Sequence, residues 1–109
     1  MAVSEDFIQY ILDQLDSLED VRYKKMFGGV GIYSRDHFFA LIENDTLRFK
    51  VDDSNRQDYE ERQMEPFRPF PGKKQTMNYY QVPIEIVENK EELRDWAHKA
   101  IDVARQKKR

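Results

Sequence analysis

Two histidines and one pair of adjacent aspartates are the side chains of this 109-residue chain that most readily do chemistry. His37 and His98 stand alone in the sequence, whereas a protein metal site takes about three or four ligands. Asp52 and Asp53 are neighbours after a strand-like segment, so their side chains point apart, and their charge suits the start of a helix. The chain has no cysteine, and no serine lies in a nucleophile-elbow pattern. We therefore predict no catalytic residues, no metal site, no cofactor and no small-molecule substrate, and thus no enzyme.

A cluster of glycines lies in the segment MFGGVGIY (26–33), which contains Gly28, Gly29 and Gly31. A phosphate-binding loop needs a helix directly after its glycines, so that the helix N-terminus faces the anion. Here the following residues alternate like a strand and lead into a hairpin. We therefore expect structural glycines, in a strand that bends, bulges or lies too close to a covering helix to carry side chains.

Cationic and aromatic residues alternate in several strand-like segments, as they do on sheets that bind single-stranded nucleic acids. In Leu47–Val51 the period of two predicts that Arg48 and Lys50 share the exposed face. The candidate contacts for nucleic acid are Arg48, Lys50, Lys24, Lys73, Tyr79 and Tyr80. A formal net charge of −3 and an isoelectric point near 5.4 argue against non-specific coating of nucleic acid. Nucleic-acid binding is therefore an alternative to protein binding, which we favour.

The first half of the chain predicts one helix and an antiparallel meander. Ser4 is placed to cap the helix, and the apolar residues from Phe7 to Leu18 recur at the spacing of one buried stripe. Segments 22–27, 29–33, 37–43 and 47–51 then follow strand patterns. The residues of Asn44-Asp45 tolerate positive φ and predict a tight hairpin turn.

The second half predicts two helices and one strand. A capping box formed by Ser54 and Gln57 predicts a short helix within 52–63. Three of the four prolines make 64–74 a loop, and 75–82 is the next strand. Asn89 is placed to cap a final helix, in which Trp96 lies on the buried stripe as a structural residue. These elements predict an α+β fold of two layers, with helices packed on one face of an antiparallel sheet.

Several segments together resemble the N-terminal domain of the TfoX/Sxy family, which is linked to the regulation of natural competence. They are RYKKMFGGVGIY, FFALI, LRFKVDDSNR, PF and MNYYQVP, and the resemblance runs from about Arg22 to Trp96. It implies an α-β-β-β-α-β-α outline and a regulatory or interaction role, with no catalytic residues to carry over. Competence regulators of this family have a second, C-terminal helical domain, and we expect this chain to be a stand-alone N-terminal domain.

Length and composition bound the remaining possibilities. The chain of 109 residues fits one domain, 1–109, and 39% hydrophobic residues suffice for a core. It has neither an apolar run of about 20 residues, as a membrane span requires, nor the layout of a signal peptide. We expect a cytoplasmic protein without membrane contact, whose partner is another protein or a second copy of itself.

Overall fold

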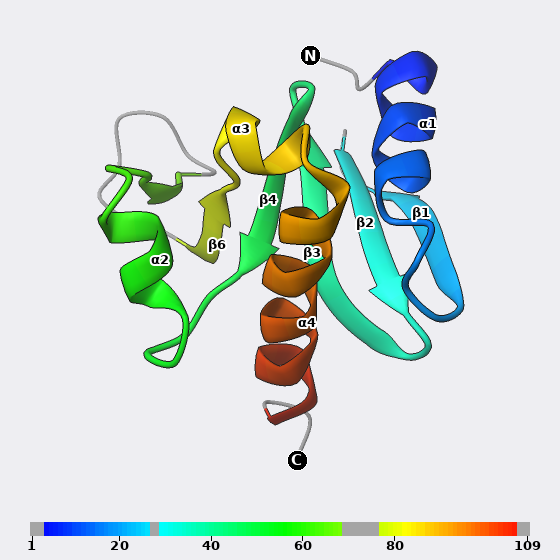
Figure 1. Cartoon of the computed structure of the whole chain (residues 1–109). Helices are drawn as coiled ribbons and strands as arrows, with labels where there is room; N and C mark the ends of the chain where they lie inside the picture. Colours follow the sequence, from blue (N-terminus) through cyan, green and yellow to red (C-terminus); the bar gives the residue numbers. More distant parts are fainter. Residues whose placement is uncertain (1–3, 27–28, 69–76, 107–109) are drawn as a thin grey trace.

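The computed structural model describes residues 4–26, 29–68 and 77–106, and its strands form one antiparallel sheet (Figure 1). The strand order is β1-β2-β3-β4-β6-β5. Figure 1 shows the long C-terminal helix in front of the central strands, with the other described helices on the same side of the sheet or beside its edge. The α+β fold expected from the sequence is confirmed. No helix in these three ranges is long and apolar enough to cross a membrane.

Helix α1 (Glu5–Gln14) begins at the predicted cap, because the Ser4 hydroxyl accepts a hydrogen bond of 3.2 Å from the Phe7 amide. The acidic residues in its first turn complement the helix dipole. The helix ends before the apolar stripe does. Leu15 and Leu18 follow in turns and are still buried in the core.

Strands β1 (Val21–Met26), β2 (Gly29–Ser34), β3 (His37–Glu43) and β4 (Thr46–Lys50) form the expected meander. Asn44 and Asp45 have φ values of 54° and 55°, which gives the tight turn that their types predict. The pairing of β2 with β3 shifts register, since Ile32 faces Ala40 while Tyr33 faces Phe38. Phe39 is thus the extra residue of a bulge.

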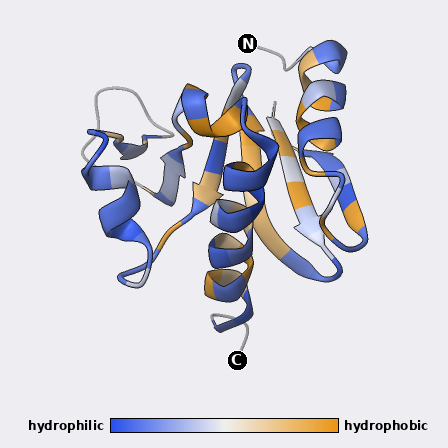
Figure 2. Ribbon diagram, viewed as in Figure 1, coloured by the Kyte–Doolittle hydropathy of each residue, from blue (hydrophilic) through white to orange (hydrophobic). Residues whose placement is uncertain are grey.

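This bulge reverses which side chains of β3 face the helices. Phe39 and Ala40 both lie in the core, and the Phe39 ring packs 5.7 Å from that of Phe49. Phe38 is left on the opposite face, stacked on Tyr33. Figure 2 shows the hydrophobic colouring concentrated along the central strands, while the outer side of α4 is hydrophilic.

The second half departs from the sequence prediction at three places. Helix α2 (Arg56–Glu60) has Asn55 at its N-cap, and Ser54 donates to Asp52 instead of forming the predicted capping box. The predicted loop contains a short strand, β5 (Pro66–Phe67), which pairs with β6 (Met77–Gln81). Helix α3 (Ile84–Val87) follows Pro83 and was not predicted.

Helix α4 (Lys90–Gln106) crosses the covered face of the sheet. As expected, Asn89 caps it: its side-chain oxygen accepts a hydrogen bond of 3.1 Å from the Glu92 amide. Trp96 is 8% exposed and lies in the core between α4 and α2.

The two described glycines of the cluster have steric reasons to lack a side chain. A Cβ on Gly29 would lie 2.7 Å from the carbonyl oxygen of Ile42. A Cβ on Gly31 would lie 2.8 Å from the end of the Met26 side chain and 3.0 Å from the Phe38 ring. The obstacles are neighbouring strands, so the proposed close approach of a covering helix is wrong. Gly28 lies outside the described residues.

Candidate binding sites

The helix-free face of the sheet holds some of the residues predicted to contact nucleic acid. In the pairing of β4 with β6, Lys50 faces Tyr79, Arg48 faces Gln81 and Phe49 faces Tyr80. Because Phe49 is in the core, Tyr80 lies on the helix side, where its ring is 5.6 Å from Tyr59. Arg48, Lys50 and Tyr79 therefore share the helix-free face and Tyr80 does not.

An aromatic row crosses this face and consists of Tyr33, Phe38 and Tyr79. Their ring centroids are 5.1 Å apart for Tyr33 and Phe38, and 5.7 Å apart for Phe38 and Tyr79. The Lys50 ammonium lies 5.7 Å from the Tyr79 centroid and 6.0 Å from that of Phe38. Tyr79 is only 6% exposed, and burial, aided by Tyr33, raises its pKa to about 12. The low exposure of Tyr79 leaves little of its ring surface open to stacking.

The expectation of an exposed Arg48 is wrong, because its side chain is only 16% exposed. The Phe67 ring covers the guanidinium, with 4.6 Å between Cζ and the ring centroid. Its acidic neighbour, Glu43, is 3.6 Å away, and the Arg48 Nε is buried without a hydrogen-bond acceptor. Desolvation lowers the Arg48 pKa, against an opposing effect of Glu43. The guanidinium stays cationic, since arginine does not deprotonate in proteins.

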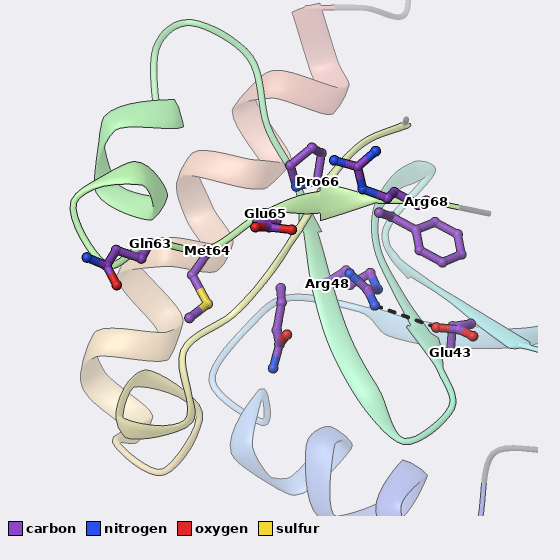
Figure 3. A pocket seen from close by; sticks show the side chains of 9 residues that line it. Glu43, Arg48, Gln63, Met64, Glu65, Pro66 and Arg68 are labelled. Atoms are coloured by element: carbon purple, nitrogen blue, oxygen red, sulfur yellow. Dashed lines mark ion pairs between the residues drawn. The ribbon is translucent and has the colours of Figure 1, made fainter. Parts of the chain in front are cut away.

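Strand β5 and the residues around it complete a pocket over Arg48 (Figure 3), with a volume of about 420 Å³. Gln63, which has a φ of 62°, precedes the segment that reaches β5. Figure 3 shows Arg48 directed toward Glu43. Pro66 and Arg68 lie on the segment that passes above this pair in the view. The pocket is lined by Glu43, Arg48, Gln63, Met64, Glu65, Pro66, Phe67, Arg68 and Gln81. The Arg48 pocket was not predicted, because its β5 wall was expected to be a loop.

The other predicted contacts are not part of this arrangement. Lys24 is exposed on β1 and faces Gly31, with two strands between it and Arg48. Lys73 lies outside the described residues. Of the candidate contacts that the structure describes, the fold therefore brings together Arg48, Lys50 and Tyr79.

An apolar groove lies between α1 and α3, has a volume of about 350 Å³ and shares the lining residue Gln81 with the Arg48 pocket. Ile84 is 64% exposed and Tyr10 is 39% exposed, although both are large hydrophobic residues. The buried Leu47 and Val82 also line this α1–α3 groove. Its full lining is Phe7, Tyr10, Asp45, Thr46, Leu47, Gln81, Val82, Ile84, Val87 and Glu88.

Two hydrogen bonds hold the walls of the α1–α3 groove. At the start of α1, the Ser4 amide donates to the Asp45 carboxylate over 2.9 Å. At the end of α1, the Gln14 side-chain amide donates to the Val87 carbonyl over 2.8 Å. Both charged residues of the described lining, Asp45 and Glu88, are acidic. The groove thus combines a fixed apolar surface with a negative edge.

The two histidines, isolated in the sequence, line one cavity of about 260 Å³. The ring nitrogen Nδ1 of His37 is buried without a hydrogen-bond partner, whereas His98 is exposed. The other ionisable residues of the lining are Glu19, Arg35 and Arg105. Within the described ranges, no group of three or more histidine, aspartate or glutamate side chains is arranged to hold a metal ion.

These features define a small α+β domain built on a single antiparallel sheet with helices on one face. The polar pocket at Arg48 and the apolar groove between α1 and α3 are surfaces suited to binding. The family model of the TfoX N-terminal domain matches residues 13–104, which is most of the chain. The chain therefore belongs to the TfoX N-terminal domain family. No curated protein matches it.

Proposed function

We propose that this chain is a cytoplasmic, non-enzymatic regulatory module that binds a partner protein through the α1–α3 groove. The exposure of Ile84 and Tyr10 on one groove carries this proposal. Exposed apolar residues that gather in a hollow mark interaction sites more often than scattered ones do. The family resemblance to competence regulators supports a regulatory role for such an interaction.

The groove can supply useful binding energy. Covering a large apolar side chain that is otherwise exposed contributes about 1.5–3 kcal/mol. Tyr10 can pack its ring and keep its hydroxyl at the wet rim, which is the usual behaviour of tyrosine at interfaces. The hydrogen bonds at Ser4 and Gln14 fix the walls before binding, which limits the entropy lost on association.

The charges at the groove indicate the chemistry of the partner. Asp45 and Glu88 lie at the lining, and no lysine, arginine or histidine is among the described lining residues. A partner segment with one or two apolar anchors flanked by lysine or arginine matches this combination. The same lining offers no histidine or cysteine to act as a base or nucleophile, which supports recognition over catalysis.

A pull-down from nuclease-treated extract of the source cells tests the proposal. The wild-type chain is compared with Ile84→Glu, and with Met77→Glu as a matched control, since Met77 is also an exposed hydrophobic residue but lies on β6. We expect a protein that is retained by the wild type and by Met77→Glu and is lost with Ile84→Glu. Size-exclusion chromatography of the three proteins distinguishes a second copy of the chain from a different partner. Equal retention by all three proteins would remove the groove from the interaction.

A second candidate function is binding of single-stranded nucleic acid on the helix-free face. The position of the Lys50 ammonium over Tyr79 and Phe38 favours it, because such cation–aromatic pairs accompany base stacking in nucleic-acid binders. The low exposure of Tyr79 and Arg48 makes it the weaker candidate.

A further inference from the structure

We propose that the Arg48 pocket binds a ligand through a single carboxylate group, with the apolar body of the ligand packed against Met64, Pro66 and Phe67. This inference does not depend on the α1–α3 groove, which lies on the helix side of the molecule.

The first argument is that the Arg48 guanidinium has a hydrogen-bond donor without an acceptor. A guanidinium carries several N–H donors in a planar fork that matches a carboxylate. Its acidic partner, Glu43, approaches only to 3.6 Å, and Nε has no acceptor at all. Buried polar groups are nearly always paired, so an arginine in this state needs a further explanation. An incoming carboxylate supplies the missing acceptor, after a small rotation of the guanidinium brings the buried Nε edge to the pocket.

The second argument is the position of Arg48. Its guanidinium is largely removed from water, where attraction to an anion is stronger than at an exposed site. The Phe67 ring covers one face of it, with 4.6 Å between Cζ and the ring centroid. The residues Gln63 and Gln81 also line the pocket and are uncharged.

The third argument concerns the charge of the ligand. Glu43 and Glu65 line the pocket together with Arg48 and Arg68, so the formal charges of its described lining residues cancel. A dianion such as phosphate would face two carboxylates, whereas one carboxylate can take the place of Glu43 beside Arg48. The Glu43 side chain is 39% exposed and can turn toward solvent. A monocarboxylate therefore suits the pocket better than a phosphate group.

The fourth argument is size. A volume of about 420 Å³ lies within the range of pockets that hold small molecules. The group that fits is a carboxylate on an aliphatic or aromatic body, either as a free small molecule or as the last residue of a peptide chain. These two sources share their chemistry and differ only in what continues from the apolar body.

Binding is tested by two-dimensional NMR titration of the full chain with 4-phenylbutyrate, and with 4-phenylbutyramide as the uncharged control. A short peptide ending in phenylalanine, with a free or an amidated C-terminus, forms the second pair, and inorganic phosphate is the third probe. We expect the free acids to shift resonances around Arg48 and Phe67, and their amides to bind at least about tenfold more weakly, as loss of a charge-assisted hydrogen bond requires. If the peptide binds more tightly, the carboxylate of the ligand is that of a chain terminus. If phenylbutyrate binds more tightly, the ligand is a small molecule.

Two variants connect binding to the proposed contacts. Arg48→Met should weaken binding of the acids at least about tenfold, whereas Arg22→Met, at an exposed arginine on β1, should not. Glu43→Gln removes the competing negative charge beside Arg48 and should tighten binding of the acids several-fold. This change has the opposite sign, so it tests the proposal even if Arg48→Met folds poorly. Equal affinity for acids and amides, preference for phosphate, or no binding by the wild type and Glu43→Gln would overturn the proposal.

Discussion

The ring of Trp96 on α4 meets the ring of Tyr59 on α2 edge to face, with 4.7 Å between their centroids. The guanidinium of Arg62 lies over the Trp96 ring at 5.2 Å, so the indole joins α4 to the segment that includes α2. Both rings belong to the core cluster. This pair is one of the contacts that attach α2 to the final helix, and the ion pair of Lys99 with Asp58, 2.8 Å apart, is another.

Replacement of Trp96 by alanine should lower the free energy of unfolding by roughly 3–5 kcal/mol, as for other buried large aromatic residues. The loss combines buried area with the cavity left beside Tyr59. Urea unfolding of the wild type and the variant measures it, with His98→Ala as the control because His98 is exposed on the same helix. In the folded wild type, Trp96 fluorescence should be blue-shifted. A red-shifted emission that is freely quenched would place the indole at the surface.

The two described glycines should differ in their tolerance of a side chain. Gly29→Ala brings a methyl group against a backbone oxygen of β3, which cannot move without breaking the sheet pairing, and should cost about 2 kcal/mol or more. Gly31→Ala meets the movable ends of Met26 and Phe38 and should cost less.

Thermal unfolding of the two alanine variants and of Gly31→Val measures this difference. The larger valine should cost about 1–3 kcal/mol, because it overpacks the same space. Equal melting temperatures for Gly29→Ala and the wild type would show that the strand can shift, and a ligand role for the glycines would then be reconsidered.

The meander was predictable because its signals are local. Alternating residues such as Leu47 and Phe49 mark a strand, and Asn44-Asp45 marks a turn, without reference to the rest of the chain. The bulge at Phe39 was not predictable, since its apolar neighbours on both sides fit either face. The burial of Arg48 depends on Phe67, which is brought over it by a strand of two residues. A pairing this short has no periodic pattern, so the Arg48 pocket required the tertiary structure.

The helix-free face should not bind oligonucleotides at physiological salt. We expect no change in the fluorescence anisotropy of labelled single- or double-stranded oligonucleotides at roughly 0.15 M salt. If Arg48 and Lys50 shared an exposed face, as the strand period predicts, the double variant Arg48→Glu and Lys50→Glu would remove binding and leave the stability nearly unchanged. This expectation is wrong for Arg48, because a glutamate there would be largely buried beside Glu43. Lys50→Glu is the cleaner variant.

Genuine binding of oligonucleotides would be recognised by its dependence on salt and on Lys50. Phosphate contacts release counterions, so genuine binding would weaken steeply with added salt. Micromolar, salt-sensitive binding that is lost in Lys50→Glu and kept in Lys99→Glu, on the helix side of the molecule, would favour nucleic-acid binding over the lead proposal.

Two tyrosines should make the folded state sensitive to alkaline pH. Burial raises the pKa of Tyr79 to about 12 and also raises that of Tyr59, while an exposed phenol in the unfolded chain ionises near its ordinary value of about 10. The folded state therefore holds these protons more tightly than the unfolded state does. The stability that they contribute is fully present below about pH 10 and is lost as the pH rises through the folded pKa values.

Urea unfolding between pH 9 and about 12 should therefore show a falling free energy of unfolding, with a shallower fall in Tyr79→Phe. Tyr59→Phe should behave differently at neutral pH as well. The Tyr59 hydroxyl is buried without a hydrogen-bond partner, so its removal should leave stability unchanged or raise it by up to about 1 kcal/mol. Tyr10→Phe is the control, since Tyr10 is exposed. A loss of more than about 1 kcal/mol in Tyr59→Phe at pH 7 would show that the hydroxyl makes a hydrogen bond worth that much, and would contradict its unpaired state.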